Sequence, residues 1–361
     1  MPPAPGVSVV IPAYNQPRLL GEALASVQAQ TAPAAEIVVI DDCSAEPLEL
    51  TTPYSSELPL RFVRHGENRG PAASAVHGIA EARCALIAML NHDDAWEPEF
   101  LERLAHALDE HPDACLAFCD HGIMRADGSH DGHLSDAQSA RYARAELDGG
   151  LLAGDALHRA AILRKAIAGS SFALARLEAL ELALIGAGSD TWDYALAVGA
   201  CRAGHPAVYV AERLGWYRVS PTMLSATHAD PRRQIELTRP QTMILIVVLR
   251  SRELRSIHGA IRRRLAAATA RSFGVALRTG SPRNLVRVAA GAIAGARDAG
   301  RVTARRATAG HTTTGCVTAD SGCDGDVSAG CVPAGREPAG CEPMRADRPP
   351  QAAQSHARPG L

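Results

Sequence analysis

The first half of the chain alternates short apolar runs with stretches of helical periodicity. Residues 7–11 form the first run, and similar runs follow at 36–40, 60–64, 86–90, 115–119 and 207–211. Between the runs, apolar residues recur every three or four positions, as in the stripe that Leu20, Ala23, Leu24 and Val27 form after Pro17. This alternation is typical of an α/β protein with a Rossmann-like, mostly parallel sheet flanked by helices.

The pattern changes in the second half. Residues 231–306 are predicted to form two or three helices without strands. From residue 307 the chain is rich in Gly, Pro, Thr and Ala, a composition that cannot bury enough apolar surface to order itself. We therefore expect an α/β domain at residues 1–230, a basic helical extension at 231–306 and a disordered low-complexity tail at 307–361.

Charge is distributed unevenly along the chain. Residues 250–306 carry 14 arginines against Glu253 and Asp298, a net of +12, which leaves −14 for the rest of a chain whose net charge is −2. Such a segment suits an anionic lipid or another polyanion, although a solvated helix face has the same pattern. Lysine occurs only once, at Lys165, whereas arginine is abundant throughout, so the number of arginines alone says little about function.

No segment predicts a membrane span or a signal peptide. The longest late apolar run, residues 243–249, is far shorter than the roughly 20 residues that a spanning helix needs. Five of the nine cysteines lie in or beside apolar stretches and are expected to be reduced, and the spacing of the other four is unlike that of zinc sites. We expect a cytoplasmic protein, with peripheral association at the inner face of the membrane if its basic helices bind lipid.

Three polar clusters come directly after apolar runs. They are residues 12–15 (Pro-Ala-Tyr-Asn), 41–44 (Asp-Asp-Cys-Ser) and 91–94 (Asn-His-Asp-Asp). In an open α/β sheet, ligands bind outside the carboxyl ends of the strands, so these clusters predict one binding edge. An aspartate there can accept hydrogen bonds from a nucleobase or a ribose hydroxyl, and Tyr14 can stack on a base; each acid taken singly could instead cap the next element.

The adjacent carboxylates of Asp93 and Asp94 predict a metal site. Two neighbouring acids repel each other unless a cation or a proton relieves the repulsion. Hard oxygen ligands favour Mg²⁺ or Mn²⁺, which could bridge a diphosphate and stabilise charge on a leaving group.

At this point the sequence resembles a known family. The segments VSVVIPAYNQ, EIVVIDDCS, ENRGPAASAVHGIAEA and LIAMLNHDDAWEPEFLERL look like those of the inverting family-two glycosyltransferases, which have the GT-A fold. The resemblance implies that Pro12, Tyr14 and Asp42 hold the nucleobase of a nucleotide sugar, and that Asp93 and Asp94 contact its ribose and metal-bound diphosphate. It makes residues 1–230 a catalytic domain.

The second half resembles the family more loosely. The segment GSDTWDYALAVGACRAGHPAVYV resembles an acidic motif whose second acid is the general base, which matches Asp190. Asp193, three residues on and on the same helix face, is the substitute candidate for the base, and a helix cap is the structural alternative for Asp190. The stretch around Gly169 to Ser171 resembles a glycine-serine segment near the donor sugar. The implied partners are a nucleotide-sugar donor and a saccharide or lipid-linked acceptor, and we expect no nucleic acid.

Three positions depart from the family pattern. Asn91 stands where an aspartate is usual, and Ser189 precedes Asp190 in place of glutamate. Ser220 stands where a histidine often follows a Tyr-Arg pair. The prediction is therefore an inverting transferase for cell-surface polysaccharide, glycolipid or glycoprotein, with a catalytically degenerate nucleotide-sugar-binding module as the alternative. A dinucleotide oxidoreductase is disfavoured because no Gly-x-Gly-x-x-Gly turn follows the first run.

Overall fold

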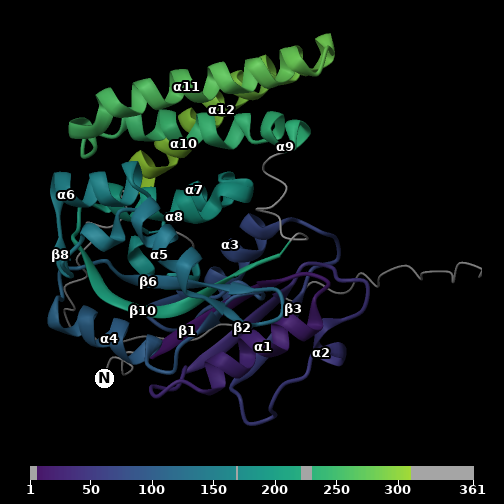
Figure 1. Ribbon diagram of the computed structural model, residues 1–361, viewed down its shortest axis with the longest axis vertical. Helices are drawn as coiled ribbons and strands as arrows, with labels where there is room; N and C mark the ends of the chain where they lie inside the picture. Colours follow the sequence, from purple (N-terminus) through teal and green to yellow (C-terminus); the bar gives the residue numbers. More distant parts are fainter. Residues whose placement is uncertain (1–5, 168–169, 221–229, 310–361) are drawn as a thin grey trace, which may run out of the picture. The chain divides into compact units, whose positions relative to one another are not determined.

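The computed structural model describes residues 6–167, 170–220 and 230–309 (Figure 1). Its centre is one mixed sheet in the order β3-β2-β1-β4-β9-β6-β10-β5, with β7 pairing with β6 and β8 with β10. The strands are β1 (Val7–Ala13), β2 (Glu36–Asp41), β3 (Leu60–Arg64), β4 (Leu86–Met89), β5 (Ala95–Trp96), β6 (Leu116–Arg125), β7 (His130–Asp131), β8 (Gly150–Leu152), β9 (Ala173–Arg176) and β10 (Ala207–Val219).

Most of the helices cover the two faces of this sheet. They are α1 (Pro17–Gln28), α2 (Leu48–Thr51), α3 (Pro71–Glu81), α4 (Phe100–Glu110), α5 (Gly132–Arg141), α6 (Gly154–His158), α7 (Leu182–Ala187) and α8 (Trp192–Ala203), followed by α9 (Pro231–Glu236), α10 (Thr238–Arg250), α11 (His258–Arg278) and α12 (Pro282–Ala309). No helix in the described part of the chain is both long enough and apolar enough to cross a membrane.

Strand pairing explains where the polar clusters go. Strands β1, β2, β3 and β4 are mutually parallel, and β6 is parallel to β10. Strand β9 runs antiparallel between β4 and β6 and joins these two groups. The expected α/β class with a mostly parallel sheet is confirmed, and the carboxyl ends of β1, β2 and β4 lie at one edge.

The side chains of β1 alternate between two hydrophobic layers. Val9 and Ile11 pack with α1 and α4, whereas Val10 packs with α3 on the opposite face. Every residue of β1 and β2 is buried, which is why both appear in the sequence as continuous apolar runs. Proline begins α1 and α3, where its missing N–H costs nothing.

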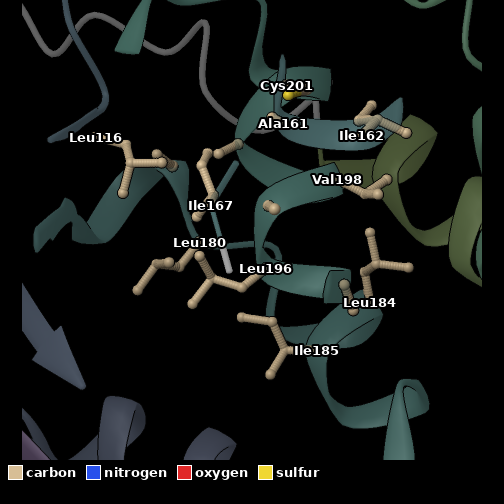
Figure 2. Packing of buried hydrophobic residues seen from close by; sticks show 14 of the residues in the cluster. Leu116, Ala161, Ile162, Ile167, Leu180, Leu184, Ile185, Leu196, Val198 and Cys201 are labelled. Carbon is tan, nitrogen blue, oxygen red and sulfur yellow. The ribbon is translucent and has the colours of Figure 1, made fainter. Parts of the chain in front are cut away.

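The C-terminal helices continue the layer formed by α7 and α8. Buried residues of α10, such as Ile244 and Val247, belong to the same hydrophobic cluster as Leu184 and Leu196. Figure 2 shows part of this cluster, in which Leu184 and Ile185 of α7 lie beside Leu196 and Val198 of α8. Residues 231–309 form four helices where two or three were expected, because a break between residues 236 and 238 separates the short α9 from α10.

Several helices and strands differ in their bounds from those expected. The strand expected at 115–119 extends to Arg125, the one at 207–211 extends to Val219, and the helix expected from Pro98 begins at Phe100. Strands β5, β7, β8 and β9 were not expected. Cys43, Cys84, Cys115, Cys119 and Cys201 are free thiols, and the other cysteines and the tail from residue 310 lie outside the described residues.

Candidate active site

The loops after β1 and β2 are joined to each other by hydrogen bonds. Asp42 N donates to Ala13 O (3.0 Å), and Asn15 N donates to Ser44 Oγ (2.9 Å). Asn15 adopts a left-handed backbone (φ 55°), and its side-chain oxygen accepts from Ala45 N (2.7 Å). Pro12 is buried at the end of β1, and Tyr14 is 43% exposed beside it. This geometry leaves one aromatic side chain of the first cluster open to a ligand.

Asp42 is buried, and internal partners surround its carboxylate. Oδ1 accepts from Arg69 N (2.9 Å) and His65 Nδ1 (2.7 Å), and Oδ2 accepts from Gly70 N (2.8 Å). Burial alone raises the pKa of Asp42, but these hydrogen bonds outweigh it and hold the pKa below its usual value. A carboxylate has about four acceptor positions, so one position remains for a ligand.

A pair of histidines extends this network. His65 Nε2 lies 2.8 Å from His77 Nδ1, and the two rings stack with centroids 5.0 Å apart. His77 lies on α3, so Asp42 is coupled to that helix as well as to the loop that precedes it. The sequence analysis did not identify either histidine. The available signal was weak, because His65 follows β3 and only the fold brings it to Asp42.

Asp94 lies deeper, at 1% exposure. Its Oδ2 accepts from Ser171 Oγ (2.7 Å) and Asn91 Nδ2 (3.0 Å), and its Oδ1 accepts from Arg218 N (3.1 Å). Burial and the neighbouring charge of Asp93 raise the pKa of Asp94 to about 8, although the hydrogen bonds oppose this change. Asn91, where the family has an acid, therefore serves as a donor to Asp94.

Arg218 holds the 91–94 loop from the other side. Its guanidinium is buried, with Nε donating to Asp93 O (2.8 Å) and NH2 to Glu22 Oε2 (2.5 Å) on α1. Arg218 was not among the predicted site residues, although a cation two residues after Trp216 within an apolar strand is a usable signal. This one side chain joins β10 and α1 to the loop that carries both aspartates.

Asp93 is half-buried, and its carboxylate is the more accessible of the two acids. No group of three His, Cys, Asp or Glu side chains within the described residues could hold a metal ion by itself. Mg²⁺ usually takes one or two protein carboxylates together with substrate phosphates, so a nucleotide-bridged ion fits Asp93. Asp94 also accepts three hydrogen bonds and so keeps one acceptor position, but because its pKa is raised it would have to lose a proton to bind the same ion.

The remaining predicted residues lie in the second half. Asp190 is placed in a 3₁₀ turn (Ser189–Thr191) that leads directly into α8, and its side chain lies outside what the structure describes. Ser189 before it adopts a left-handed backbone (φ 48°). Gly169 lies outside the described residues. Its neighbour Ser171 does reach the edge, since its hydroxyl also accepts from Asn91 N (3.0 Å). The roles of all these residues stay predictions.

Comparison with known proteins agrees with this geometry. Residues 8–169 match the family model Glycosyl transferase family 2. The succinoglycan biosynthesis protein ExoO of Rhizobium meliloti is 33% identical over 144 residues, covering 39% of this chain and 41% of that protein. The putative teichuronic acid biosynthesis glycosyltransferase TuaG of Bacillus subtilis is 28% identical over 127 residues, covering 35% and 50%. The matches thus span half or less of these relatives.

The fold has solved counterparts as well. S. aureus TarS 1-349, crystallised in complex with UDP-GlcNAc, superimposes with a TM-score of 0.60 at 18% identity, covering 83% of each chain. Identity this low shows a shared fold, which is the GT-A fold that the sequence resemblance implied. The family match covers β1 to β4, the loops that follow them and the segment up to Gly169. Residues 8–169 therefore match glycosyl transferase family 2, and the described chain has the GT-A fold.

Proposed function

We propose that this protein is an inverting glycosyltransferase that moves a sugar from a nucleoside-diphosphate-sugar donor to a hydroxyl acceptor. The observation that carries the proposal is the joining of the loops after β1, β2 and β4 into one polar edge of a GT-A sheet. The β4 loop joins the edge through His92, whose Nδ1 lies 3.2 Å from Pro12 O. The names of ExoO and TuaG support a role in the synthesis of cell-surface polysaccharide, glycolipid or glycoprotein.

The donor side follows from this edge. Tyr14 is exposed and stacks on the base, and Pro12 packs beneath the base. Asp42 accepts a hydrogen bond from the base or the ribose with its remaining lone pair. The UDP-GlcNAc complex of TarS, which has the same fold, supports a nucleotide-sugar donor. Gly169 is proposed to lie close to the donor sugar, where the absence of a Cβ allows close approach.

A divalent ion, Mg²⁺ or Mn²⁺, would supply positive charge to the leaving diphosphate. Asp93 would hold it with its accessible carboxylate, and Asp94 would be a second ligand in its ionised form. Arg218 fixes the main chain of Asp93 and so orients that carboxylate towards the diphosphate. Asn91 contributes no negative charge, which lowers the affinity of the site for the ion.

Asp190 is proposed as the general base. It takes the proton from the acceptor hydroxyl as the oxygen attacks the anomeric carbon, while the bond from that carbon to the phosphate oxygen breaks and the nucleoside diphosphate leaves. Attack opposite the leaving group inverts the anomeric configuration. Its place just before α8 is compatible with this role, because the N-terminus of a helix favours the ionised carboxylate, which is the form that accepts a proton.

The test is slow hydrolysis of a panel of nucleotide sugars by the purified protein, with manganese or with a chelator. We expect one donor to be hydrolysed, and hydrolysis to fall at least about 100-fold with the chelator or on Asp93→Asn, since several kcal/mol of charge stabilisation are lost. With an acceptor preparation, Asp190→Asn should abolish transfer. Asp109→Asn, an exposed acid on α4, is the matched control. Full turnover with the chelator and in Asp190→Asn would contradict the proposal.

A second candidate is a nucleotide-sugar-binding module without catalysis. The hydrogen bond from Asn91 Nδ2 to Asp94 favours it, because an amide replaces a potential ligand. Calorimetry with UDP and other nucleoside diphosphates separates the two candidates. Binding without hydrolysis or transfer for every donor tested would identify the module.

The C-terminal helices are proposed to lie on an anionic membrane surface, on the cytoplasmic side. Leu277, Val286 and Ile293 are exposed on α11 and α12, among the arginines of these helices. Each basic residue near an anionic surface contributes about 1 kcal/mol. In co-sedimentation, the protein should bind phosphatidylglycerol vesicles and not neutral ones, and equal binding to both would contradict the proposal.

A further inference from the structure

A cavity of about 600 Å³ lies next to the turn that carries Asp190. It is open to solvent on one side and lies between α5, the segment before residue 168, the start of α8, and helices α10 and α11. Its lining includes Arg141, Lys165, Thr191, Asp193, Arg264 and Arg271. Thr191 and Asp193 come from the residues just after Asp190. No residue of the loops after β1, β2 and β4 lines it. The cavity therefore belongs to the side of the site predicted for the acceptor.

The lining carries a large excess of positive charge. Four cationic side chains, on α5, α11 and the segment before residue 168, face one carboxylate, that of Asp193. None of the four forms an ion pair with any residue in the described ranges. The buried arginines elsewhere are paired: Arg144 with Asp120, Arg202 with Glu181 and Arg218 with Glu22. Two of the four cations, Arg141 and Arg271, are exposed, and Lys165 and Arg264 are half-buried. Four cations that share one cavity with a single carboxylate favour an anionic ligand.

Lys165 is the only lysine in the chain, and it lies in this cavity. Its backbone is left-handed (φ 57°), a conformation that costs a residue with a Cβ about 1 kcal/mol and is maintained mainly at functional positions. Its ammonium lies over the ring of Tyr194, 4.9 Å from the centroid, and the guanidinium of Arg264 lies 5.4 Å from the same centroid. The ring of Tyr194 thus contacts two of the cations.

The position of Arg264 is fixed by the α/β body. Its NH1 donates to Ile162 O (3.0 Å) and lies 3.4 Å from Tyr194 Oη, so α11 is attached to the wall of the cavity. Burial and the charge of Arg264 lower the pKa of Lys165, which an anion between them would reverse. The cationic groups are therefore arranged before any ligand arrives.

We propose that this cavity binds a phosphate or carboxylate group carried by the acceptor, next to the hydroxyl that receives the sugar. The inference rests on the proposed function, because it identifies the acceptor as an anionic saccharide or a phosphate-linked one. The cavity supplies two or more guanidinium groups and one compact ammonium, a set that matches the oxygens of phosphate or carboxylate.

The single lysine makes the cavity measurable without any catalytic assay. An amine-acylating reagent can label only Lys165 and the N-terminal amine, and peptide mass spectrometry separates the two products. With inorganic pyrophosphate at ten times its Kd, labelling of Lys165 should slow about tenfold, because only about a tenth of the sites remain free. KCl at the same ionic strength should leave the rate unchanged, and the N-terminal amine is the internal control.

Two substitutions on α11 distinguish a specific anion-binding site from a general attraction of anions to a basic surface. Arg271→Gln removes a lining cation and should raise the pyrophosphate concentration for half-protection about tenfold, the effect of one lost charge-assisted hydrogen bond. Arg263→Gln makes the same change at an exposed position outside the lining and should leave it unchanged. Equal effects of the two substitutions, or equal protection by KCl, would overturn the proposal.

The source of the anion is decided by comparing probes. Protection by UDP but not by pyrophosphate or glycerol phosphate would assign the cavity to the donor and overturn the proposal. Protection only by phosphatidylglycerol vesicles would assign it to membrane lipid and overturn it too. Protection by the small phosphates in Asp93→Asn, whose donor hydrolysis is expected to fail, would support the anion site independently of catalysis.

Discussion

Gly295 lies in α12 where this helix crosses α10. A Cβ at this position would lie 2.4 Å from Arg239 O and 3.0 Å from Met243 N, both of which are main-chain atoms of α10. Neither atom can rotate away as the end of a flexible side chain could. Gly295→Ala should therefore push the two helices apart and destabilise the protein, although alanine is the better helix former.

The size of the effect follows from these distances. An ordinary contact of a Cβ is about 3.4 Å, so the helices must separate by about 1 Å. A gap of this size removes roughly a quarter to a half of the dispersion energy of each contact between α10 and α12. Overpacking of this kind costs about 1–3 kcal/mol, and the helix propensity of alanine returns about 1 kcal/mol. We expect a net loss of up to roughly 2 kcal/mol and a Tm lower by up to roughly 6 °C.

Thermal unfolding followed by circular dichroism measures this shift. Gly274→Ala on α11 is the matched control, because Arg278 NH1 at 3.8 Å is the one atom near its added Cβ. This control should gain about 1 kcal/mol from helix propensity. The same substitution then has opposite signs on two neighbouring helices. If Gly295→Ala melts at or above the temperature of the unaltered protein, the described contact between α10 and α12 is incorrect.

Two further predictions concern titratable groups. Burial and the charge of Asp93 raise the pKa of Asp94 to about 8, so the native carboxyl stays protonated over a range in which the unfolded one, with a pKa near 3.8, is ionised. In EDTA the unfolding free energy, measured by urea titration, should therefore fall as pH rises from 4 to 8. Asp94→Asn should flatten this dependence on pH. If the dependence is the same in Asp94→Asn as in the unaltered protein, the prediction is refuted. Burial also raises the pKa of Cys115 to about 11 and of Cys119 to about 12. Iodoacetamide at pH 8 should therefore alkylate the half-buried Cys43 and leave Cys115 and Cys119 unmodified, which peptide mass spectrometry can verify.

The central strands could be predicted because their burial is complete. Strands β1 and β2 are covered on both faces, so their central positions are apolar and the run is visible without any neighbour. Strand β9 could not be predicted in this way. Its sequence Ala-Leu-Ala-Arg favours a helix locally, and it is extended because it fills the space between β4 and β6.

The same distinction applies to the site. The positions of Tyr14, Asp42, Asp93 and Asp94 follow from strand ends, which the pattern predicts. The enclosure of Asp94 could not be predicted, because it depends on the hydroxyl of Ser171 and the main chain at Arg218 arriving from the second half of the chain. The cavity next to Asp190 was also not predicted, since it needs α11 to fold back over α8.

The direction of β9 determines when the site is complete during synthesis. Because β9 runs opposite to β4, its beginning lies beside the end of β4, and Ser171 just before it meets Asp94, 77 residues earlier in the chain. Arg218 is a further 47 residues along, 124 from Asp94. Contacts this distant form late as the chain leaves the ribosome. A nascent chain ending at Glu110 has already emerged with all four family segments, yet its Asp94 is still exposed to water and its donor edge is unfinished.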